Sequence, residues 1–463
     1  MSSAEEEVRL SMTVMINKEK TKVLFSIVDN NLADILLSFL TLPLGLIIRL
    51  FKKHYGDDEV PIIGSLNTLC DGLANLDSSH FWTESGKLML LNPRNSLDDQ
   101  CRKLKINIDD TYRYVSMSHD TERCDCGKLL NREIYEDLEV YNNNGKVFIE
   151  EPMNFLISDD LRLLPNVTAS MIKSMKDLGI TDTDGVEQMT VTIGFNEIMV
   201  LLKESLLSQT PLTDLILKKD QTHHSPSIKL ETLPENIKKE TTCSAKKMMV
   251  KAIVQKSKSK LLFVEAEEDF VDFLFSLLTI PLGEVECLLG GKASIWSIDN
   301  LYCSLSNLNH YRHMESIDTI EELLDPKLPP NYLSKNQILP ISQQKGHPIL
   351  YFKENDESMK FSCYPYYSYQ KDYFKDPKGG DSFVKGPKVF MVTDDLTVTP
   401  LCMFSTISIL NGLKIPLSDV EERELHIGLE EGLSILKASI TSSSALTDGL
   451  INSILKKQPK QEN

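Results

Sequence analysis

The sequence predicts an α+β protein built from two tandem copies of one unit. Residues 22–45 and 260–283 align at a constant offset of 238, and 11 of the 24 aligned positions are identical. An ordinary composition would give about one or two identities by chance. In each copy a run of alternating apolar residues precedes apolar residues at helical spacing. Strands and helices in this order favour an α+β fold over a doubly wound parallel sheet.

The similarity between the copies continues beyond this opening segment. Residues 157–165 (ISDDLRLLP) correspond to 392–400 (VTDDLTVTP), and residues 201–214 correspond to 435–448. The internal repeat therefore covers most of the chain.

We expect a first repeat unit over residues 8–218, a linker over 219–245 and a second repeat unit over 246–456. The expected linker has no aromatic residue and contains two prolines among mixed charges. This composition is typical of a connecting segment.

Each unit is expected to open with a β-hairpin. Apolar residues alternate with mostly polar ones over residues 8–16, a polar turn follows, and residues 23–28 (VLFSIV) form a second apolar run. Residues 248–254 keep the same alternation in the second copy. A period of two with a short polar connection predicts two antiparallel strands.

An amphipathic helix is expected after each hairpin. Apolar residues recur at the spacing of one helix face over residues 32–40 and again over 270–278. Pro43 and Pro281 are expected to end these helices, because the proline ring clashes with the preceding turn.

A late strand and a closing helix complete each predicted unit. The strand is expected at residues 155–160 in the first copy and 389–395 in the second. The closing helix is expected over residues 191–206 and 425–440, where apolar residues recur at helical spacing.

The composition is that of an acidic, water-soluble protein. The net charge is −17, and the pI is about 5.1. This charge argues against nucleic acid or an anionic membrane as the main partner. The acidic start of the chain resembles no secretory or transit signal, and the nine cysteines are then expected to be reduced. We expect a cytoplasmic protein, with the nucleus as the alternative.

One stretch resembles a membrane span in length and apolarity. Residues 35–51 are almost continuously apolar, which is near the lower limit for crossing a bilayer. The second copy holds Glu284 and Glu286 at corresponding positions, and carboxylates are costly in hydrocarbon. We therefore expect no membrane span, but a buried helical segment broken at Pro43 and Gly45.

The best candidate for metal chemistry is a group of cysteines in the middle of the first copy. Cys124 and Cys126 lie close together, with Cys101 upstream and His119 nearby; thiolates and imidazole are the usual zinc ligands. The C-x-C spacing differs from a standard zinc knuckle, and the second copy keeps only Cys363. A loop with spare thiols is therefore preferred to a zinc site, and we expect no cofactor and no stoichiometric catalytic metal.

Matched aspartates in the two copies are interpreted as structural residues. Neighbours on a strand point to opposite faces, so the Asp159–Asp160 and Asp394–Asp395 pairs cannot act as acid–base dyads. Their position before a turn suits side-chain bonds to backbone N–H groups. Asp34 and Asp272 are interpreted as acids that favour the positive start of a helix.

Four motifs together resemble one known family. They are NPRN with CRKLKINIDD (92–110), CDCGKLLNREI (124–134), VDFLFSLLTIPLG (271–283) and MVTDDLTVTP (391–400). The chain resembles the plant family called domain of unknown function 674. The resemblance implies two such units in tandem and no assigned activity, cofactor or substrate.

The absence of a recognised catalytic motif favours a non-enzymatic function. We expect a protein-interaction or scaffold protein, because two related domains present related surfaces and raise the effective concentration for a partner. The partner is expected to be a protein and not a nucleic acid; no small-molecule ligand is indicated. The alternative is an unrecognised, metal-assisted enzyme that uses the divergent insertions at 105–147 and 345–382.

Overall fold

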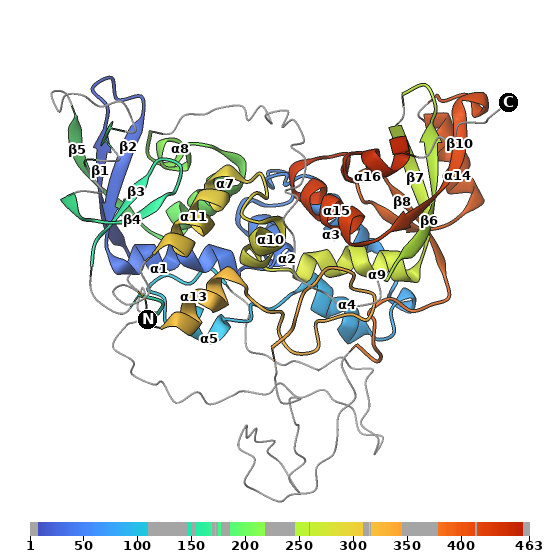
Figure 1. Ribbon diagram of the computed structural model, residues 1–463, viewed down its shortest axis with the longest axis horizontal. Coiled ribbons are helices and arrows are strands. Elements are labelled where there is room, and N and C mark those ends of the chain that lie inside the picture. Colours follow the sequence, from blue (N-terminus) through green and yellow to red (C-terminus); the bar gives the residue numbers. More distant parts are fainter. Residues whose placement is uncertain are drawn as a thin grey trace, which may run out of the picture.

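Two antiparallel β-sheets stand at opposite ends of the molecule, with helices packed between them (Figure 1). Each sheet has five strands, which confirms the predicted α+β class. The computed structural model describes residues 8–109, 147–149, 153–168, 172, 175–176, 186–217, 246–258, 260–308, 314, 316–344, 378–412 and 414–456. The expected linker at 219–245 lies outside the described residues.

The first sheet has the strand order β4-β3-β2-β1-β5. The predicted hairpin forms its centre, and the predicted late strand lies beside it. The strands are β1 (Leu10–Ile16), β2 (Val23–Val28), β3 (Phe155–Ser158), β4 (Leu163–Pro165) and β5 (Glu187–Ile193).

The second sheet has the equivalent order, β9-β8-β7-β6-β10, when it is read from the same side. In both sheets the last strand along the chain, β5 or β10, lies beside the first strand of the hairpin. The strands are β6 (Met248–Gln255), β7 (Lys260–Glu267), β8 (Val389–Thr393), β9 (Val398–Pro400) and β10 (Val420–Ile427).

The pairing of the hairpin strands also corresponds at the offset of 238. Val14 pairs with Ser26 in the first sheet, and Ala252 pairs with Val264 in the second. Both hairpins carry a register shift at the equivalent place. Since a slip of one residue would turn every side chain to the other face, the buried alternation of β1 and β6 sets this common register.

The remaining elements are helices, most of which lie between the sheets, whereas α14 lies on the outer side of the second sheet (Figure 1). In the first half they are α1 (Asn30–Ser38), η1 (Phe39–Thr41), α2 (Leu44–Tyr55), α3 (Leu66–Asn75), η2 (Ser78–His80), α4 (Glu84–Leu91), α5 (Asp98–Cys101), α7 (Phe195–Leu207) and α8 (Pro211–Leu217). In the second half they are α9 (Glu268–Ser276), η3 (Leu277–Thr279), α10 (Leu282–Leu289), α11 (Trp296–Asn307), α13 (Ile317–Leu324), α14 (Met403–Gly412), η4 (Leu417–Asp419), α15 (Leu429–Thr441) and α16 (Ala445–Lys456).

The apolar stretch at residues 35–51 is divided between two buried helices. α1 gives way to a short 3-10 turn, and α2 starts directly after Pro43. The expected break at Gly45 is wrong, because Gly45 lies inside α2. A Cβ atom there would lie 3.0 Å from the Leu278 carbonyl oxygen, so glycine permits a close approach of the two halves. In the described part of the chain, no helix has the length and apolarity of a membrane span.

The start of the closing helix differs from the prediction in both halves. Val191 and Leu425, which were expected on its apolar face, lie on β5 and β10. Gly194 and Gly428 separate strand from helix, and each N–H donates to a glutamate three residues later. Val191 and Leu425 fitted the helical pattern because each lies about one helical turn before the first residue of the helix. Gly194 and Gly428 mark the true boundary between strand and helix.

One hydrophobic core extends through both halves of the chain. Leu36 is 1% exposed and Leu274 is fully buried, in agreement with their predicted places on the buried helix faces. A smaller cluster around Phe263 lies on the other face of the second sheet and includes Leu410 of α14.

The halves meet at the two equivalent prolines. Pro43 and Pro281 form an antiparallel bridge. The Leu44 N–H donates to the Ile280 carbonyl, and the Leu282 N–H donates to the Leu42 carbonyl, both at 3.0 Å. Because equivalent positions pair with each other, the two halves are related at this contact by an approximate two-fold axis.

Each half also sends one helix onto the other half. α3 packs against α9 and β9, and α11 packs against α7 and β4. Ser65 Oγ donates to the Ser442 carbonyl at 2.7 Å, and Ser297 Oγ donates to the Ser208 carbonyl at 3.0 Å. Because these two contacts join equivalent residues, each half docks its helix on the other half in the same way.

Candidate functional site

Of the candidate cysteine–histidine group, Cys101 alone lies among the described residues. Cys101 is 1% exposed and contacts Thr41 Oγ1 at 3.6 Å and Asn95 Nδ2 at 3.4 Å. Burial raises the pKa of its thiol to about 12, and the thiolate form is needed for zinc ligation. His119, Cys124 and Cys126 lie outside the described residues.

The first aspartate of each Asp-Asp pair joins the turn after a strand to the last helix of its half, α8 or α16. Asp159 accepts hydrogen bonds from the N–H and the hydroxyl of Thr213, both at 2.8 Å. Asp394 accepts from the Thr447 N–H at 2.8 Å. These contacts support the structural interpretation. They also explain why the Asp-Asp pair occurs together with the Leu-Thr-Asp segment (212–214 and 446–448) in both halves.

The Asp159 carboxyl should make stability depend on pH. Burial raises its pKa from 3.8 to about 6, although the hydrogen bonds from Thr213 oppose the shift. Between these values the unfolded chain loses its proton while the folded chain keeps it, so stability falls as pH rises from about 4 to 6. The loss of unfolding free energy should reach about 3 kcal/mol.

Urea unfolding at several pH values tests this prediction. The free energy of unfolding of Asp159→Asn should depend less on pH over this range than that of the wild type. The exposed control, Asp58→Asn, should keep the wild-type dependence. Parallel profiles would contradict the prediction.

The interpretation of Asp34 and Asp272 as helix-start acids is wrong. Neither lies in the first turn of its helix. Asp272 Oδ1 accepts the N–H groups of Phe383 and Val384 at 2.7 and 2.8 Å, and Asp34 accepts the equivalent pair of N–H groups from residues 148–149. Each aspartate therefore anchors the segment that leads into β3 or β8.

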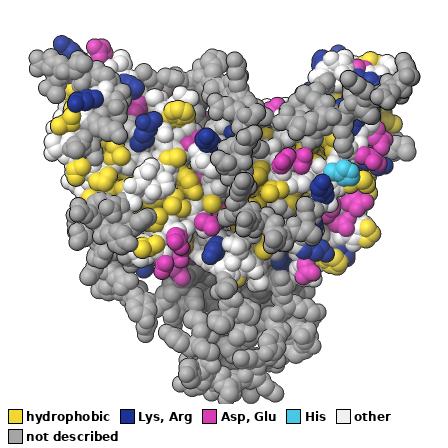
Figure 2. Space-filling view, viewed as in Figure 1, with side chains coloured by type: hydrophobic (Ala, Val, Ile, Leu, Met, Phe, Trp, Pro, Cys, Tyr) yellow, Lys and Arg dark blue, Asp and Glu magenta, His cyan; other side chains and the backbone are white. Residues whose placement is uncertain are grey.

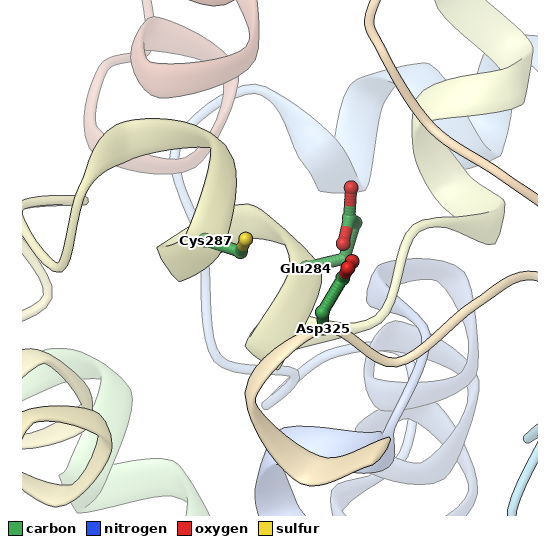
Figure 3. Close-up of side chains that lie close together, drawn as sticks. All are labelled: Glu284, Cys287 and Asp325. Carbon is green, nitrogen blue, oxygen red and sulfur yellow. The ribbon is translucent and has the colours of Figure 1, made fainter. Parts of the chain in front are cut away.

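Three side chains of different chemistry converge at the centre of the second half (Figure 3). Glu284 and Cys287 lie one turn apart on α10, and Asp325 caps the C-terminus of α13. Their ligand atoms all lie within 4.8 Å of one another. Carboxylate and thiolate groups at this separation are ligands that Zn²⁺ accepts. We call Glu284, Cys287 and Asp325 the α10 cluster.

The α10 cluster is confined to one half of the molecule. The corresponding positions of the first half hold Leu46 and Arg49 on α2 and Asn92 at the end of α4. Tyr302 borders the cluster and donates to the Leu324 carbonyl at 3.2 Å. Burial and, to a smaller extent, Cys287 raise the pKa of Tyr302, so its hydroxyl stays protonated. Metal binding or catalysis by the α10 cluster would therefore use residues of the second half alone.

A second group of ionisable side chains lies on another side of α10. Glu286 is fully buried, and burial followed by the neighbouring Asp299 raises its pKa well above the ordinary value. Burial also raises the pKa of Asp299, whose Oδ1 accepts the Ile295 N–H at 3.3 Å. Both carboxyls therefore favour the neutral form, because two adjacent buried carboxylates repel each other.

Replacing the buried Glu286–Asp299 carboxyl pair with its first-half counterpart should stabilise the protein. Ile48 and Asn67 occupy the corresponding positions, and Asn67 Oδ1 accepts the Ile63 N–H as Asp299 accepts its own partner. We expect Glu286→Ile with Asp299→Asn to raise the free energy of unfolding by about 1–3 kcal/mol, since the change removes a buried carboxyl group whose oxygens have no hydrogen-bond partner among the described residues.

Chemical denaturation measures this gain, and the reverse exchange supplies the control. Ile48→Glu should destabilise the first half, because it places an unpartnered carboxyl in the core. A double variant less stable than the wild type would show that the pair contributes favourably to the fold.

The sequence contained a signal for both groups. Glu284 and Glu286 are acidic residues at positions where the first half has the apolar residues Leu46 and Ile48. Asp325 and Asp299 lie 41 and 13 residues from Glu284 and Glu286, as 325 − 284 and 299 − 286. Their proximity required the folded arrangement.

These observations define a mixed α+β protein with two five-stranded antiparallel sheets and a central helical core. The chain belongs to the family described as "Protein of unknown function (DUF674)", whose sequence pattern matches residues 6–430. The resemblance seen in the motifs is thereby confirmed. No curated protein and no solved structure matches the chain.

Proposed function

We propose that this protein is a non-enzymatic interaction scaffold that arose by tandem duplication. Its units are residues 8–218 and 246–456, joined by 219–245. Three correspondences support the duplication: the order of the strands, the register of the hairpins and the offset of 238 between them. The internal repeat, plant origin and cytoplasmic location (nuclear as the alternative) belong to the same proposal.

The observation that carries the scaffold function is the reciprocal docking of α3 and α11. Gly64, which precedes α3, has a φ of +49°, and a Cβ atom there would lie 2.5 Å from the Ser439 carbonyl oxygen. The Ser65 N–H donates to the same oxygen at 2.8 Å. Such close contacts, together with the common core, hold the two sheets at a fixed separation. A rigid frame can present two related surfaces to one partner simultaneously.

Affinity purification of the full chain from native tissue, with cross-linking and mass spectrometry, tests the scaffold function. We expect a reproducible protein partner with cross-links to both halves. Gly64→Ala should weaken the docking of α3 and reduce the recovery of this partner. Gly412→Ala, where no atom lies within 4 Å of the added Cβ, is the matched control. Both variants are compared at a temperature at which their circular dichroism equals that of the wild type. Absence of any reproducible partner would contradict the proposal.

The α10 cluster favours a second candidate function, the binding of a divalent cation. Glu284 is 2% exposed, and the corresponding residue in the other half is a core leucine. A carboxyl group at a core position is destabilising unless a cation or hydrogen bonds compensate for the lost hydration. Zinc bound by two carboxylates and one thiolate would leave a fourth position for water or substrate, which is the arrangement that the enzyme alternative needs.

Zinc titration of the full chain without a histidine tag tests this second function. We expect one equivalent to bind if the cluster is a metal site. Asp325→Asn, which copies Asn92 of the first half, should abolish that binding. Asp318→Asn, an exposed acid on the same helix, should leave it unchanged. Failure of the wild type to bind zinc would exclude this function for zinc.

A further inference from the structure

The outer strands of the two sheets differ in their charge. Among the described residues, β5 pairs only with β1 and β10 only with β6. β10 reads VEERELHI, with four acidic or basic residues, whereas β5 reads EQMTVTI, with one. Figure 2 shows acidic side chains gathered over the right-hand end of the molecule, where β10 lies. The single charge of β5, Glu187, forms an ion pair with Lys20 at 2.8 Å.

One pair of matched positions shows the difference most clearly. Met189 of β5 pairs with Val14 of β1 and is 40% exposed. The corresponding residue of β10 is Arg423, which lies opposite Ala252 and pairs with Glu421. Charged side chains on an outer strand prevent another strand from pairing with it. β10 therefore has this protection, and β5 does not.

We propose that β5 pairs antiparallel with β5 of a second copy of this chain, joining the two first sheets into one. This inference rests on the proposed interaction function and identifies the protein partner as a second copy of the chain. A contact of a strand with its own copy is two-fold symmetric, so it closes at the dimer. β10 takes no part in the contact.

The sequence of β5 is self-complementary in this arrangement. With Thr190 on the two-fold axis, it faces Thr190 of the second copy. Met189 then faces Val191 of the second copy, and Gln188 faces Thr192. Threonine pairs and apolar pairs across antiparallel strands are favourable.

The charges of β5 also permit this pairing. The two Glu187 side chains would lie six residues apart along the joined strands, a distance of about 20 Å. This separation exceeds the Debye length of about 8 Å at physiological ionic strength, and each carboxylate already has Lys20 as its partner. Self-pairing of β5 thus places no like charges opposite each other, although each chain carries a net charge of −17.

Sedimentation equilibrium of the full chain over a wide concentration range tests the proposal. The monomer mass is 52.4 kDa, and we expect a twofold higher mass at high concentration. Met189→Arg, which copies Arg423, should give a monomer with unchanged circular dichroism. Met249→Arg, at a 50% exposed methionine on β6 away from the sheet edge, should remain dimeric. If Met189→Arg fails to fold, Thr190→Lys replaces it.

Hydrogen exchange supplies an independent readout. The amides of residues 187–193 should exchange more slowly at high than at low concentration, and those of β10 should not change. A wild-type chain that is monomeric throughout, or a Met189→Arg variant that still dimerises, would overturn the proposal. The scaffold function would survive that result if the purification experiment recovers a different protein partner.

Discussion

Asp272→Ala is expected to lower the free energy of unfolding by about 3–5 kcal/mol, because several buried hydrogen-bond donors lose their acceptor. Asp272 is fully buried and accepts four hydrogen bonds. The donors are the N–H groups of Phe383 and Val384, the Ser334 hydroxyl and the Asn336 amide. Alanine would leave these donors without their acceptor, and each unsatisfied buried group costs about 1–3 kcal/mol.

Urea denaturation of two further variants separates the hydrogen bonds from the loss of volume. Asp272→Asn keeps one acceptor oxygen and should lose less stability than Asp272→Ala. Asp34→Ala removes the equivalent anchor, whose bonds to Phe148 and Ile149 are longer, at 3.2 and 3.1 Å, and should also lose less. The amides of Phe383 and Val384 should exchange faster in Asp272→Ala. A loss below about 1 kcal/mol, the contribution of a single hydrogen bond, would show that the network is dispensable.

Leu36→Ala is expected to lower the free energy of unfolding by about 2–5 kcal/mol, through lost contacts and the cavity left behind. Leu36 and its counterpart Leu274 both belong to the core that crosses the two halves. We expect Leu274→Ala to have a similar effect and to produce a single unfolding transition, because the main hydrophobic core is shared by the two halves.

Ile62→Ala is the control for these two substitutions. Ile62 is 70% exposed, so its truncation should change stability by less than about 0.5 kcal/mol. A small effect of Leu36→Ala, or two separate transitions in the leucine variants, would contradict the single-core description.

The spacing of apolar residues along the chain predicted several individual helices and strands. The hairpins, α1 and α9, and the late strands β3 and β8 were all expected from periodicity, because one buried face repeats every two or 3.6 residues. The strands β5 and β10 were missed. Only a few residues of each are buried, so their alternation is weak, and Val191 and Leu425 also fitted a helical spacing.

The candidate sites depended on contacts that no local pattern contains. The candidate group around Cys101 rested on cysteine spacing, and the structure describes only Cys101 of that group, buried beside Thr41 and Asn95. The α10 cluster combines one turn of a helix with the cap of another. Only the i, i+3 spacing of Glu284 and Cys287 could be read from the chain.

The amino-acid sequence by itself determined the α+β class, the offset of 238 and the family of the protein. Each of these properties is a local or repeated pattern of side chains. The tertiary structure decided how the halves combine. It paired Pro43 with Pro281, exchanged α3 and α11, and placed Asp272 as the acceptor for a distant segment. These contacts join residues from separate parts of the chain, and they form because folding brings buried apolar faces and buried polar groups next to partners that are distant in the sequence.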